Sequence, residues 1–305
     1  MSRFARVLCA QLLMLLAMTA SGGAAAQDCR PARLAQFAVS LMGNVPIVSV
    51  RVNGSPAALL FDTGAERTVL TAAAAKRLGI EPHYEYAREM RILDSAVASG
   101  DATLHSLDFG STAFREVRIL VGSVSLPNVD GKPLDGLLGA DFFTSFEVDL
   151  DLEHRHVTLY EPAPCSIEAP AWSAPFATIK ANLSLHERLF FPVVLDGHKI
   201  DALIDTGAQL TALDAEAAAA IGVTGVELAR DPVADLRGAA AEMVKARAHR
   251  FSRLEIDGET LRDQVIVVTR LGLQDADLVL GGDFLHWQRV WLSYPSHQIF
   301  VQRHF

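Results

Sequence analysis

The stretch LLFDTGAERTVL, residues 59–70, returns later in the chain as ALIDTGAQLTAL, residues 202–213. Sliding the sequence by 205 − 62 = 143 positions aligns residues 48–80 with residues 191–223 without a gap, and 13 of these 33 positions are identical. Similarity of this extent within one chain indicates a duplicated structural unit. We therefore expect two halves of similar fold, each presenting one Asp-Thr-Gly-Ala.

Each half carries a second matching sequence, GLLGADFF around Gly139 and LVLGGDFL around Gly281. Their spacing from the acid agrees, since 139 − 62 = 77 and 281 − 205 = 76. The sequences FEVDLDLEHRHVTLY, from Phe146, and QRVWLSYPSHQIFV, from Gln288, follow these two landmarks. Their alternation is typical of half-buried strands. The two halves thus carry the same parts in the same order.

One stretch in each half has the signals of a short helix. Thr71 and Asp214 are suitable N-cap residues, alanine-rich helix formers follow, and Gly79 and Gly222 stand where a helix would end. The remainder is strand-like. The sequence therefore predicts an all-β fold of two homologous β-barrel halves, related by a pseudo-twofold axis, each with one short helix.

The ends of these halves follow from two atypical segments. Residues 161–175, EPAPCSIEAPAWSAP, contain four prolines that prevent a continuous ladder or helix. Near the start, Arg3 and Arg6 precede the apolar run 7–20 and small residues before Gln27, which is the form of a secretory signal peptide. We expect a signal peptide at 1–26, halves at 27–160 and 176–305, and a linker at 161–175.

Composition restricts the partners and the compartment. The formal net charge is −9, and removing 1–26 with its two arginines and no acids makes it −9 − 2 = −11. An acidic chain without a Lys/Arg cluster is a poor nucleic-acid binder. The run 7–20 is shorter than the ~20 residues of a spanning helix, so a retained anchor is the less favoured alternative. We expect a periplasmic or secreted monomer without stable membrane insertion.

Two cysteines remain after cleavage at Ala26, Cys29 near the new N-terminus and Cys165 in the linker. An even pair in an oxidising compartment is a candidate disulfide. Two unpaired buried thiols are the alternative.

The paired motifs resemble those of a known family. Asp-Thr-Gly-Ala after a hydrophobic strand, followed by hydrophobic-hydrophobic-Gly, resembles the retropepsin-like aspartic proteases, especially bacterial members with a Leu-Gly-x-Asp-Phe signature. Retroviral enzymes have one such half per chain and dimerise, whereas pepsin-like enzymes carry two. This chain resembles retropepsin-type halves arranged in the pepsin manner. The resemblance implies acid-protease barrels with Asp62 and Asp205 as catalytic residues of one site.

The resemblance also implies roles for the neighbours of these acids. Thr63 and Thr206 would exchange hydrogen bonds across the junction and hold the two carboxyls side by side. Gly139 and Gly281 would let a neighbouring segment pass each acid without a Cβ clash. The expected active-site support comes from Thr63, Gly64, Ala65, Thr206, Gly207, Ala208, Gly139 and Gly281.

Paired carboxyls suit general acid–base chemistry. Two carboxylates about 3 Å apart cannot both ionise easily, so the pair shares one proton and titrates as a unit. General acid and general base are then available together without a cofactor or metal. Pepsin-like enzymes usually have Ser or Thr after Asp-Thr-Gly, whereas Ala65 and Ala208 carry no hydroxyl donor. We therefore expect raised apparent pKa values and activity at mildly acidic to near-neutral pH.

A polypeptide substrate would enter as an extended strand, because a cleft between two β-domains offers backbone partners on both sides. Residues 91–100 and 236–241 are candidate flaps over it. Glu66 and Gln209 follow the two motifs where retroviral enzymes have Asp, so the halves differ in charge near the cleft. Aliphatic pocket walls are expected near Leu60, Leu137, Leu203 and Leu280.

Two alternatives remain open. The chain could be a non-catalytic periplasmic peptide-binding module with a misaligned acid pair, or it could pair its acids between two chains. His154 and His156 have no third ligand nearby in sequence, so a metal site is not expected there. No phosphate-binding glycine motif, HExxH or Gly-x-Ser-x-Gly competes with the acid pair.

Overall fold

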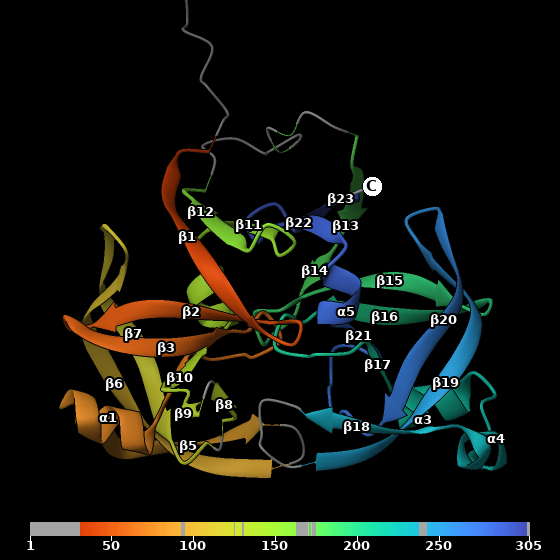
Figure 1. The fold of residues 1–305 in the computed structure, drawn as a ribbon, viewed down its shortest axis with the longest axis horizontal. Helices are drawn as coiled ribbons and strands as arrows, with labels where there is room; N and C mark the ends of the chain where they lie inside the picture. Colours follow the sequence, from red (N-terminus) through yellow and green to blue (C-terminus); the bar gives the residue numbers. More distant parts are fainter. Residues whose placement is uncertain are drawn as a thin grey trace, which may run out of the picture.

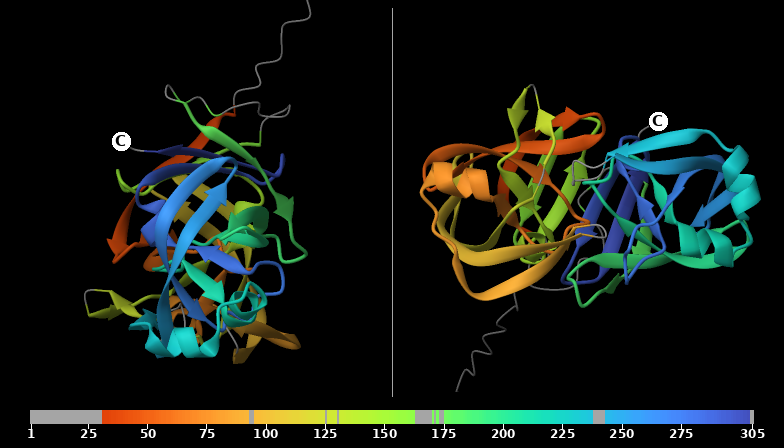
Figure 2. Two further views of the ribbon diagram at one scale, coloured as in Figure 1. Left: turned by 90° about the vertical axis from the view of Figure 1, so that its right-hand side faces the viewer. Right: turned by 90° about the horizontal axis from the view of Figure 1, so that it is seen from below.

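The chain forms a mostly β structure of two barrel-like halves that lie side by side (Figures 1 and 2). A computed structural model describes residues 31–92, 95–124, 126–129, 131–162, 170, 172, 175–237 and 243–303. The predicted fold class is confirmed. The expected signal peptide, both cysteines of the candidate disulfide and most of the linker lie outside the described residues.

The N-terminal half has the strand order β1-β2-β3-β10-β4-β7-β6-β5. Strand β10 lies between β3, to which it is parallel, and β4, to which it is antiparallel. β8 and β9 form a separate small hairpin. The strands are β1 (Arg33–Met42), β2 (Val45–Val52), β3 (Ser55–Phe61), β4 (Val69–Thr71), β5 (His83–Ile92), β6 (Ser95–Phe109), β7 (Thr112–Gly122), β8 (Asn128–Val129), β9 (Lys132–Pro133) and β10 (Gly136–Leu138).

The C-terminal half repeats this arrangement, with the order β14-β15-β16-β21-β17-β20-β19-β18. Here β21 lies between β16, its parallel neighbour, and β17, its antiparallel neighbour. The duplication therefore extends well beyond the 33 aligned residues. The strands are β14 (Asn182–Leu183), β15 (Leu189–Leu195), β16 (His198–Ile204), β17 (Ala212–Asp214), β18 (Val233–Arg237), β19 (Met243–Ile256), β20 (Glu259–Thr269) and β21 (Leu278–Leu280).

A shared antiparallel sheet joins the halves, in the order β13-β23-β22-β11-β12-β1. Its central pair is β11–β22, in which Asp149 lies opposite Trp291. Since 291 − 149 = 142 and 281 − 139 = 142, equivalent residues face each other, as a pseudo-twofold axis through this pair requires. The remaining strands are β11 (Glu147–Asp151), β12 (His156–Tyr160), β13 (Ala177–Lys180), β22 (Gln288–Ser293) and β23 (Gln298–Arg303).

Helices α1 (Ala72–Leu78) and α3 (Ala215–Ala220) occupy the expected places. Thr71 and Asp214 cap their N-termini with side-chain oxygens, and Gly79 ends α1 in the left-handed region at φ 69°. The described residues contain three further helices. One of them, α4 (Gly225–Arg230), begins with a Thr-x-x-Glu capping box. The others, α2 (Ala140–Phe143) and α5 (Gly282–Leu285), follow the two glycine landmarks.

Buried polar contacts cross the shared sheet. Glu147 is 1% exposed and accepts hydrogen bonds from Trp291 Nε1, at 2.9 Å, and Ser293 Oγ, at 3.0 Å. Asp149 is 2% exposed and accepts two from Arg289, at 2.9 and 2.6 Å. These contacts satisfy buried carboxyls of one half with donors of the other.

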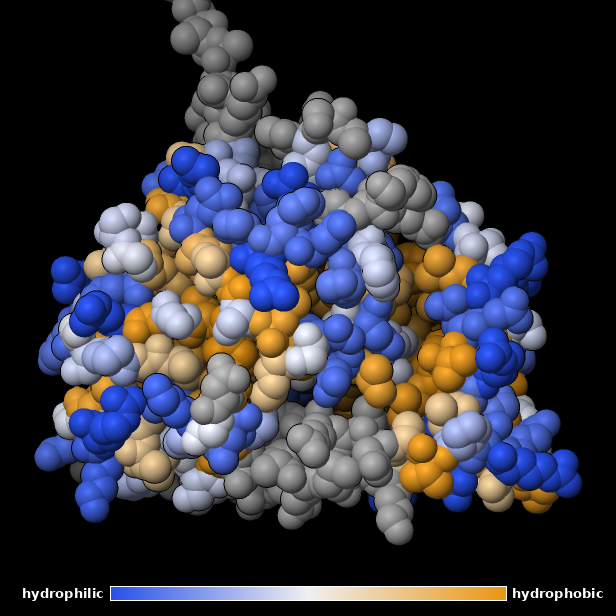
Figure 3. Space-filling view, viewed as in Figure 1, coloured by the Kyte–Doolittle hydropathy of each residue, from blue (hydrophilic) through white to orange (hydrophobic). Residues whose placement is uncertain are grey.

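Apolar residues are buried in the interior of both halves, and polar residues cover most of the outer surface. One apolar core runs through both halves, including Phe61, Leu138, Phe191 and Leu280. The outer edges of both halves are mainly hydrophilic in Figure 3, whereas apolar residues show in recesses nearer the centre. Within the described residues, no helix combines the length and apolarity needed to cross a bilayer.

The shared sheet yields a stability prediction. Replacing Arg289 by Met should lower the free energy of unfolding by about 3 kcal/mol, because Asp149 would remain as a buried carboxylate without its partner. Chemical denaturation at neutral pH measures the loss. The matched control is Arg253→Met, since Arg253 and Glu255 form a more exposed ion pair whose loss should cost less than about 1 kcal/mol. Equal losses of unfolding free energy in the two variants would contradict a stabilising role for the Arg289–Asp149 contact.

Candidate active site

The two acids follow equivalent strands and meet at the junction of the halves. Asp62 comes directly after β3 and Asp205 directly after β16. The Asp62 N–H donates to the Leu138 carbonyl at 3.0 Å, and the Asp205 N–H donates to the Leu280 carbonyl at 3.1 Å. The inserted strands β10 and β21 thereby hold the first peptide of each motif.

Crossed hydrogen bonds between Thr63 and Thr206 hold the two motifs together. The Thr63 N–H donates to Thr206 Oγ1 at 3.0 Å, and the Thr206 N–H donates to Thr63 Oγ1 at 3.1 Å. Each hydroxyl then donates to the opposite half, Thr63 to the Ile204 carbonyl at 2.8 Å and Thr206 to the Phe61 carbonyl at 2.5 Å. Both threonines are at most 2% exposed, so every one of these groups needs its partner.

The carboxyls of Asp62 and Asp205 hydrogen-bond each other within this framework. One oxygen of Asp62 also accepts from the N–H groups of Gly64 and Ala65, both at 3.0 Å. One oxygen of Asp205 accepts from the N–H groups of Gly207, at 2.8 Å, and Ala208, at 3.1 Å.

Gly64 and Gly207 are required by close approach. A Cβ added at Gly64 would overlap the carboxyl group of Asp205, and a Cβ added at Gly207 would overlap that of Asp62. Each motif glycine therefore provides the space for the acid of the other half. Neither position needs a positive φ, so the requirement is steric contact and not backbone freedom.

Burial dominates the electrostatics of the pair. It raises the pKa of Asp62 well above its usual range, and the nearby Asp205 charge raises that pKa further. Burial also raises the pKa of Asp205, against the hydrogen bonds that it accepts and the charge of Arg188. Asp62 is 5% exposed and Asp205 is half-buried. The pair consequently retains a proton at pH values where isolated carboxyls have lost theirs.

The late glycines lie against the loops that follow the acids. A Cβ on Gly139 would come within 2.6 Å of the Arg67 carbonyl oxygen, and one on Gly281 within 2.6 Å of the Leu210 carbonyl oxygen. The neighbouring groups are backbone atoms, which cannot rotate away. Any larger residue would displace the loop between the acid and the next strand.

A Thr–Asp contact in each half was missed in the sequence. Thr68 donates its N–H and hydroxyl to Asp141 Oδ1 at 2.7 and 2.8 Å, and its hydroxyl oxygen accepts from the Gly139 N–H at 3.1 Å. Thr211 and Asp283 repeat the first two contacts at 2.7 and 2.8 Å, and the Gly281 N–H donates to Thr211 Oγ1 at 3.2 Å. Both pairs tie the acid's loop to the glycine turn. The signal was available, because the threonines and the aspartates are identical in the aligned halves.

Apolar clusters line the loops on both sides of the junction. Leu60 and Leu137 pack in a cluster that Ala65 contacts. Leu203 occupies the corresponding cluster of the second half. Leu280 belongs instead to the main core, because it points to the other face of β21; Val279 takes the place expected for it.

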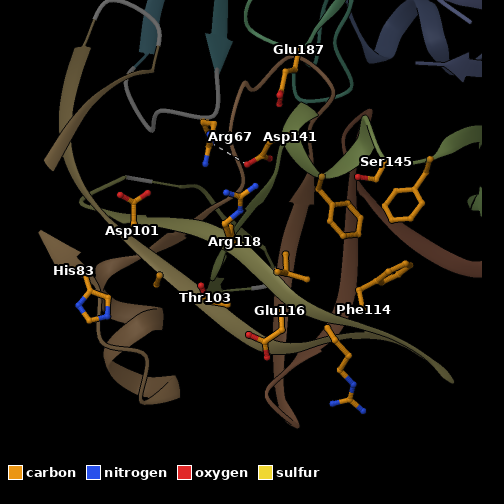
Figure 4. Close-up of a pocket in the computed structure, with 15 residues that line it drawn as sticks. Arg67, His83, Asp101, Thr103, Phe114, Glu116, Arg118, Asp141, Ser145 and Glu187 are labelled. Carbon is orange, nitrogen blue, oxygen red and sulfur yellow. Dashed lines mark ion pairs between the residues drawn. The ribbon is translucent and has the colours of Figure 1, made fainter. Parts of the chain in front are cut away.

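A cavity of about 760 Å³ opens on the flank of the N-terminal half (Figure 4). Arg67 and Asp141 form an ion pair of 3.1 Å at one side, and Glu187 reaches it from the other half. Neither Asp62 nor Asp205 lines this cavity. Within the described residues, no group of three or more His, Cys, Asp or Glu is placed to hold a metal ion.

Loops from each half dock against the acid loop of the other half, with different chemistry. Glu66 pairs with His186 at 2.9 Å and lies 3.8 Å from Arg188. On the opposite side, the Gln209 carbonyl accepts a hydrogen bond of 3.4 Å from the Asn44 side chain. One side of the junction is therefore charged and the other is neutral.

Two hairpins, β5–β6 and β18–β19, extend from the two halves toward the middle of the molecule, opposite the shared sheet (Figures 1 and 2). The candidate flap 91–100 spans the end of β5 and the start of β6, and 236–241 begins at the end of β18. Residues 93–94 and 238–242 lie outside the described residues.

Comparison with known proteins agrees with this architecture. Residues 48–142 and 191–284 match the family described as Aspartyl protease, and the chain belongs to this family. The chain is similar to the aspartic proteinase of Irpex lacteus, with 14% identity, a TM-score of 0.52, and coverage of 88% of this chain and 97% of that one. At this identity the likeness shows the shared fold. The comparison with curated proteins gave no match.

The steric role of the late glycine can be tested. Gly139→Ala should lower the free energy of unfolding by about 3 kcal/mol, because its Cβ meets fixed backbone. Gly225→Ala is the matched control, since a Cβ there meets nothing within 4 Å and alanine favours the first turn of α4. Denaturant titration of both variants compares them. A Gly139→Ala variant as stable as the control would show that the loop yields at little cost.

Stability should also fall as pH rises above the usual carboxyl range. Folded-state pKa values raised above the unfolded ~3.9 mean that the folded protein holds a proton that the unfolded chain has released. Stability present below the unfolded pKa is therefore lost as pH rises toward the folded pKa, by up to about 1.4 kcal/mol per pH unit per proton.

Unfolding curves over a pH series measure this slope. Asp62→Asn should flatten it, because the variant removes one of the two mutually repelling acids. Asp257→Asn, in an exposed turn, should leave the slope unchanged. A curve for Asp62→Asn that runs parallel to the wild-type curve would mean that the pair does not carry the raised pKa.

Proposed function

We propose that the protein is an aspartic endopeptidase that hydrolyses extended polypeptides through a water molecule activated between Asp62 and Asp205. The observation that carries the proposal is the hydrogen-bonded carboxyl pair, held by crossed threonines at the junction of two equivalent halves. Family membership and fold support a protease. The roles of individual residues are our inference from the geometry.

The proposed chemistry uses the single shared proton. The ionised carboxyl takes a proton from the water molecule while the water oxygen bonds to the scissile carbonyl carbon. The protonated carboxyl donates a hydrogen bond to the carbonyl oxygen of the substrate. Collapse of the tetrahedral intermediate breaks the C–N bond, and the amine leaves with a proton from the pair. This cycle passes through no covalent enzyme intermediate.

The environment of the pair supports work at mildly acidic to near-neutral pH. Burial raises both pKa values, and Ala65 and Ala208 contribute N–H donors without the added hydroxyl. Proposed partners are a polypeptide bound as an extended strand and no nucleic acid. We further propose that the exported, periplasmic or secreted chain acts as a monomer, since both acids belong to one chain.

Single substitutions test the proposal. Asp62→Asn and Asp205→Asn should each lower kcat/KM by at least about 10³-fold, because both acids serve one water molecule. Cleavage of a denatured proteome, followed by identification of the products, measures activity and specificity together. Asp257→Asn is the control and should cleave normally.

Other outcomes separate the alternatives. Peptide affinity that survives either substitution, with no wild-type cleavage at any pH, would favour a binding module. Activity that falls on dilution, and returns when the two variants are mixed, would favour acids paired between chains. Wild-type activity with a maximum below about pH 3 would contradict the raised pKa values of the pair.

A further inference from the structure

Arg188 is a buried cation beside the acid pair. It is 5% exposed and lies between β14 and β15 of the C-terminal half. Its Nε and Nη2 donate to the two carboxylate oxygens of Asp275 at 3.0 and 2.7 Å. This two-point geometry fixes the plane of the guanidinium group.

The third nitrogen of Arg188 reaches the other half. Nη1 donates to the Gly64 carbonyl at 3.1 Å. That carbonyl belongs to the same peptide unit as the Ala65 N–H, which donates to Asp62 Oδ1 at 3.0 Å. Arg188 and Asp62 therefore bind opposite ends of one peptide dipole. Linked hydrogen bonds of this kind strengthen each other.

The same contact places the cation close to the second acid. Gly64 packs directly against the Asp205 carboxyl, leaving no room for a Cβ. Since Asp275 binds the Nε–Nη2 edge and Nη1 donates to the Gly64 carbonyl, the guanidinium lies between Asp275 and the motif that carries Asp62. The charge of Arg188 accordingly opposes the effect of burial on the pKa of Asp205.

The aligned positions of the other half carry no cation. The 143-residue offset places Val45 opposite Arg188, and the 142-residue offset places Pro133 opposite Asp275. Neither side chain carries a charge or a hydrogen-bond donor. The arginine pair therefore breaks the pseudo-twofold symmetry that relates the two motifs.

We propose that Arg188 is a positioning residue of the acid pair, which holds the Gly64–Ala65 peptide against Asp62 and makes the two carboxyls electrostatically unequal. This inference rests on the proposed function. Among the described residues, the ionisable groups that contact Arg188 or lie near the acids are Asp275, Glu66 with its partner His186, and Tyr294. Among these, burial raises the pKa of Tyr294, so it stays neutral over the working range.

The pH dependence of kcat/KM tests the inference. Arg188→Met should move the acid limb upward by about one pH unit, because the pair loses a nearby positive charge. Arg188→Lys keeps the positive charge, so its acid limb should lie where the wild-type limb lies. Its kcat/KM should be lower than that of the wild type, because lysine cannot make the two-point hydrogen bond of the guanidinium group. Asp275→Asn should move the acid limb to lower pH, because the carboxylate that offsets the positive charge of Arg188 is removed.

Arg289→Met is the matched control. Arg289 also makes two hydrogen bonds to a buried carboxylate, but it lies in the shared sheet. The Arg289→Met variant should be less stable than the wild type, and the acid limb of its kcat/KM profile should not shift. If Arg188→Met and Asp275→Asn lower only the rate, with unshifted limbs, Arg188 has a merely structural role and the inference is wrong. If Arg188→Met does not fold, the opposed comparison of Arg188→Lys with Asp275→Asn still decides.

A second measurement separates this inference from the proposed function. Titration of ¹³C-labelled aspartate carboxyls by NMR, assigned with Asp62→Asn and Asp205→Asn, follows the pair without any cleavage assay. If the wild type cleaves nothing but Arg188→Met raises the first apparent pKa of the pair, the proposed function fails and the inference stands. If the wild type cleaves and the carboxyl titration is the same in Arg188→Met, the inference alone fails.

Discussion

Two partly buried carboxyls repel each other in their charged forms, and the surrounding groups of both halves hold them together. Charged forms of both acids together would be costly in this setting, so the pair must be held in place by other groups. The crossed bonds between Thr63 and Thr206 do this with donors and acceptors that are themselves buried. Each half completes the hydrogen bonds of the other, and neither motif is complete alone.

The strands, glycines and Thr–Asp contacts around the acid pair all help to hold the two acid loops in position. The inserted strands β10 and β21 bind the first peptide of each motif, and the glycines that follow them admit the acid loops without a Cβ. The Thr68–Asp141 contact and its counterpart tie loop to turn. At the far end, the shared sheet brings equivalent strands together on the same axis. Equivalent backbone segments of the two halves thus meet both at the acid motifs and in the shared sheet.

Near the acid pair, the departures from symmetry lie in the side chains. The strand order of the main sheet repeats in both halves, whereas the side chains of the docking loops do not repeat. Arg188 and Glu66 put charge on one side of the junction, where Val45 and Gln209 stand on the other. A duplicated fold can therefore keep its geometry while the two acids come to occupy different electrostatic surroundings.

Repetition made much of this readable from the sequence. Gapless alignment of the motifs indicated two like halves, and capping residues such as Thr71 marked the first helix. The Thr68–Asp141 contact could have been found, because both residues recur in the second half. Arg188 could not, since its counterpart is valine and its partners Asp275 and Gly64 are 87 and 124 residues away. Nothing local marks such a contact.

The duplication, the strand-rich class and the two motif acids can be recognised in the amino-acid sequence alone, because they depend on local pattern and on a fixed period. The contact between the carboxyls, the fit of each motif glycine against the opposite acid, and the arginine beside the pair emerge only from the folded structure. Those are contacts between segments distant in the chain, and they exist only once both halves have closed on each other.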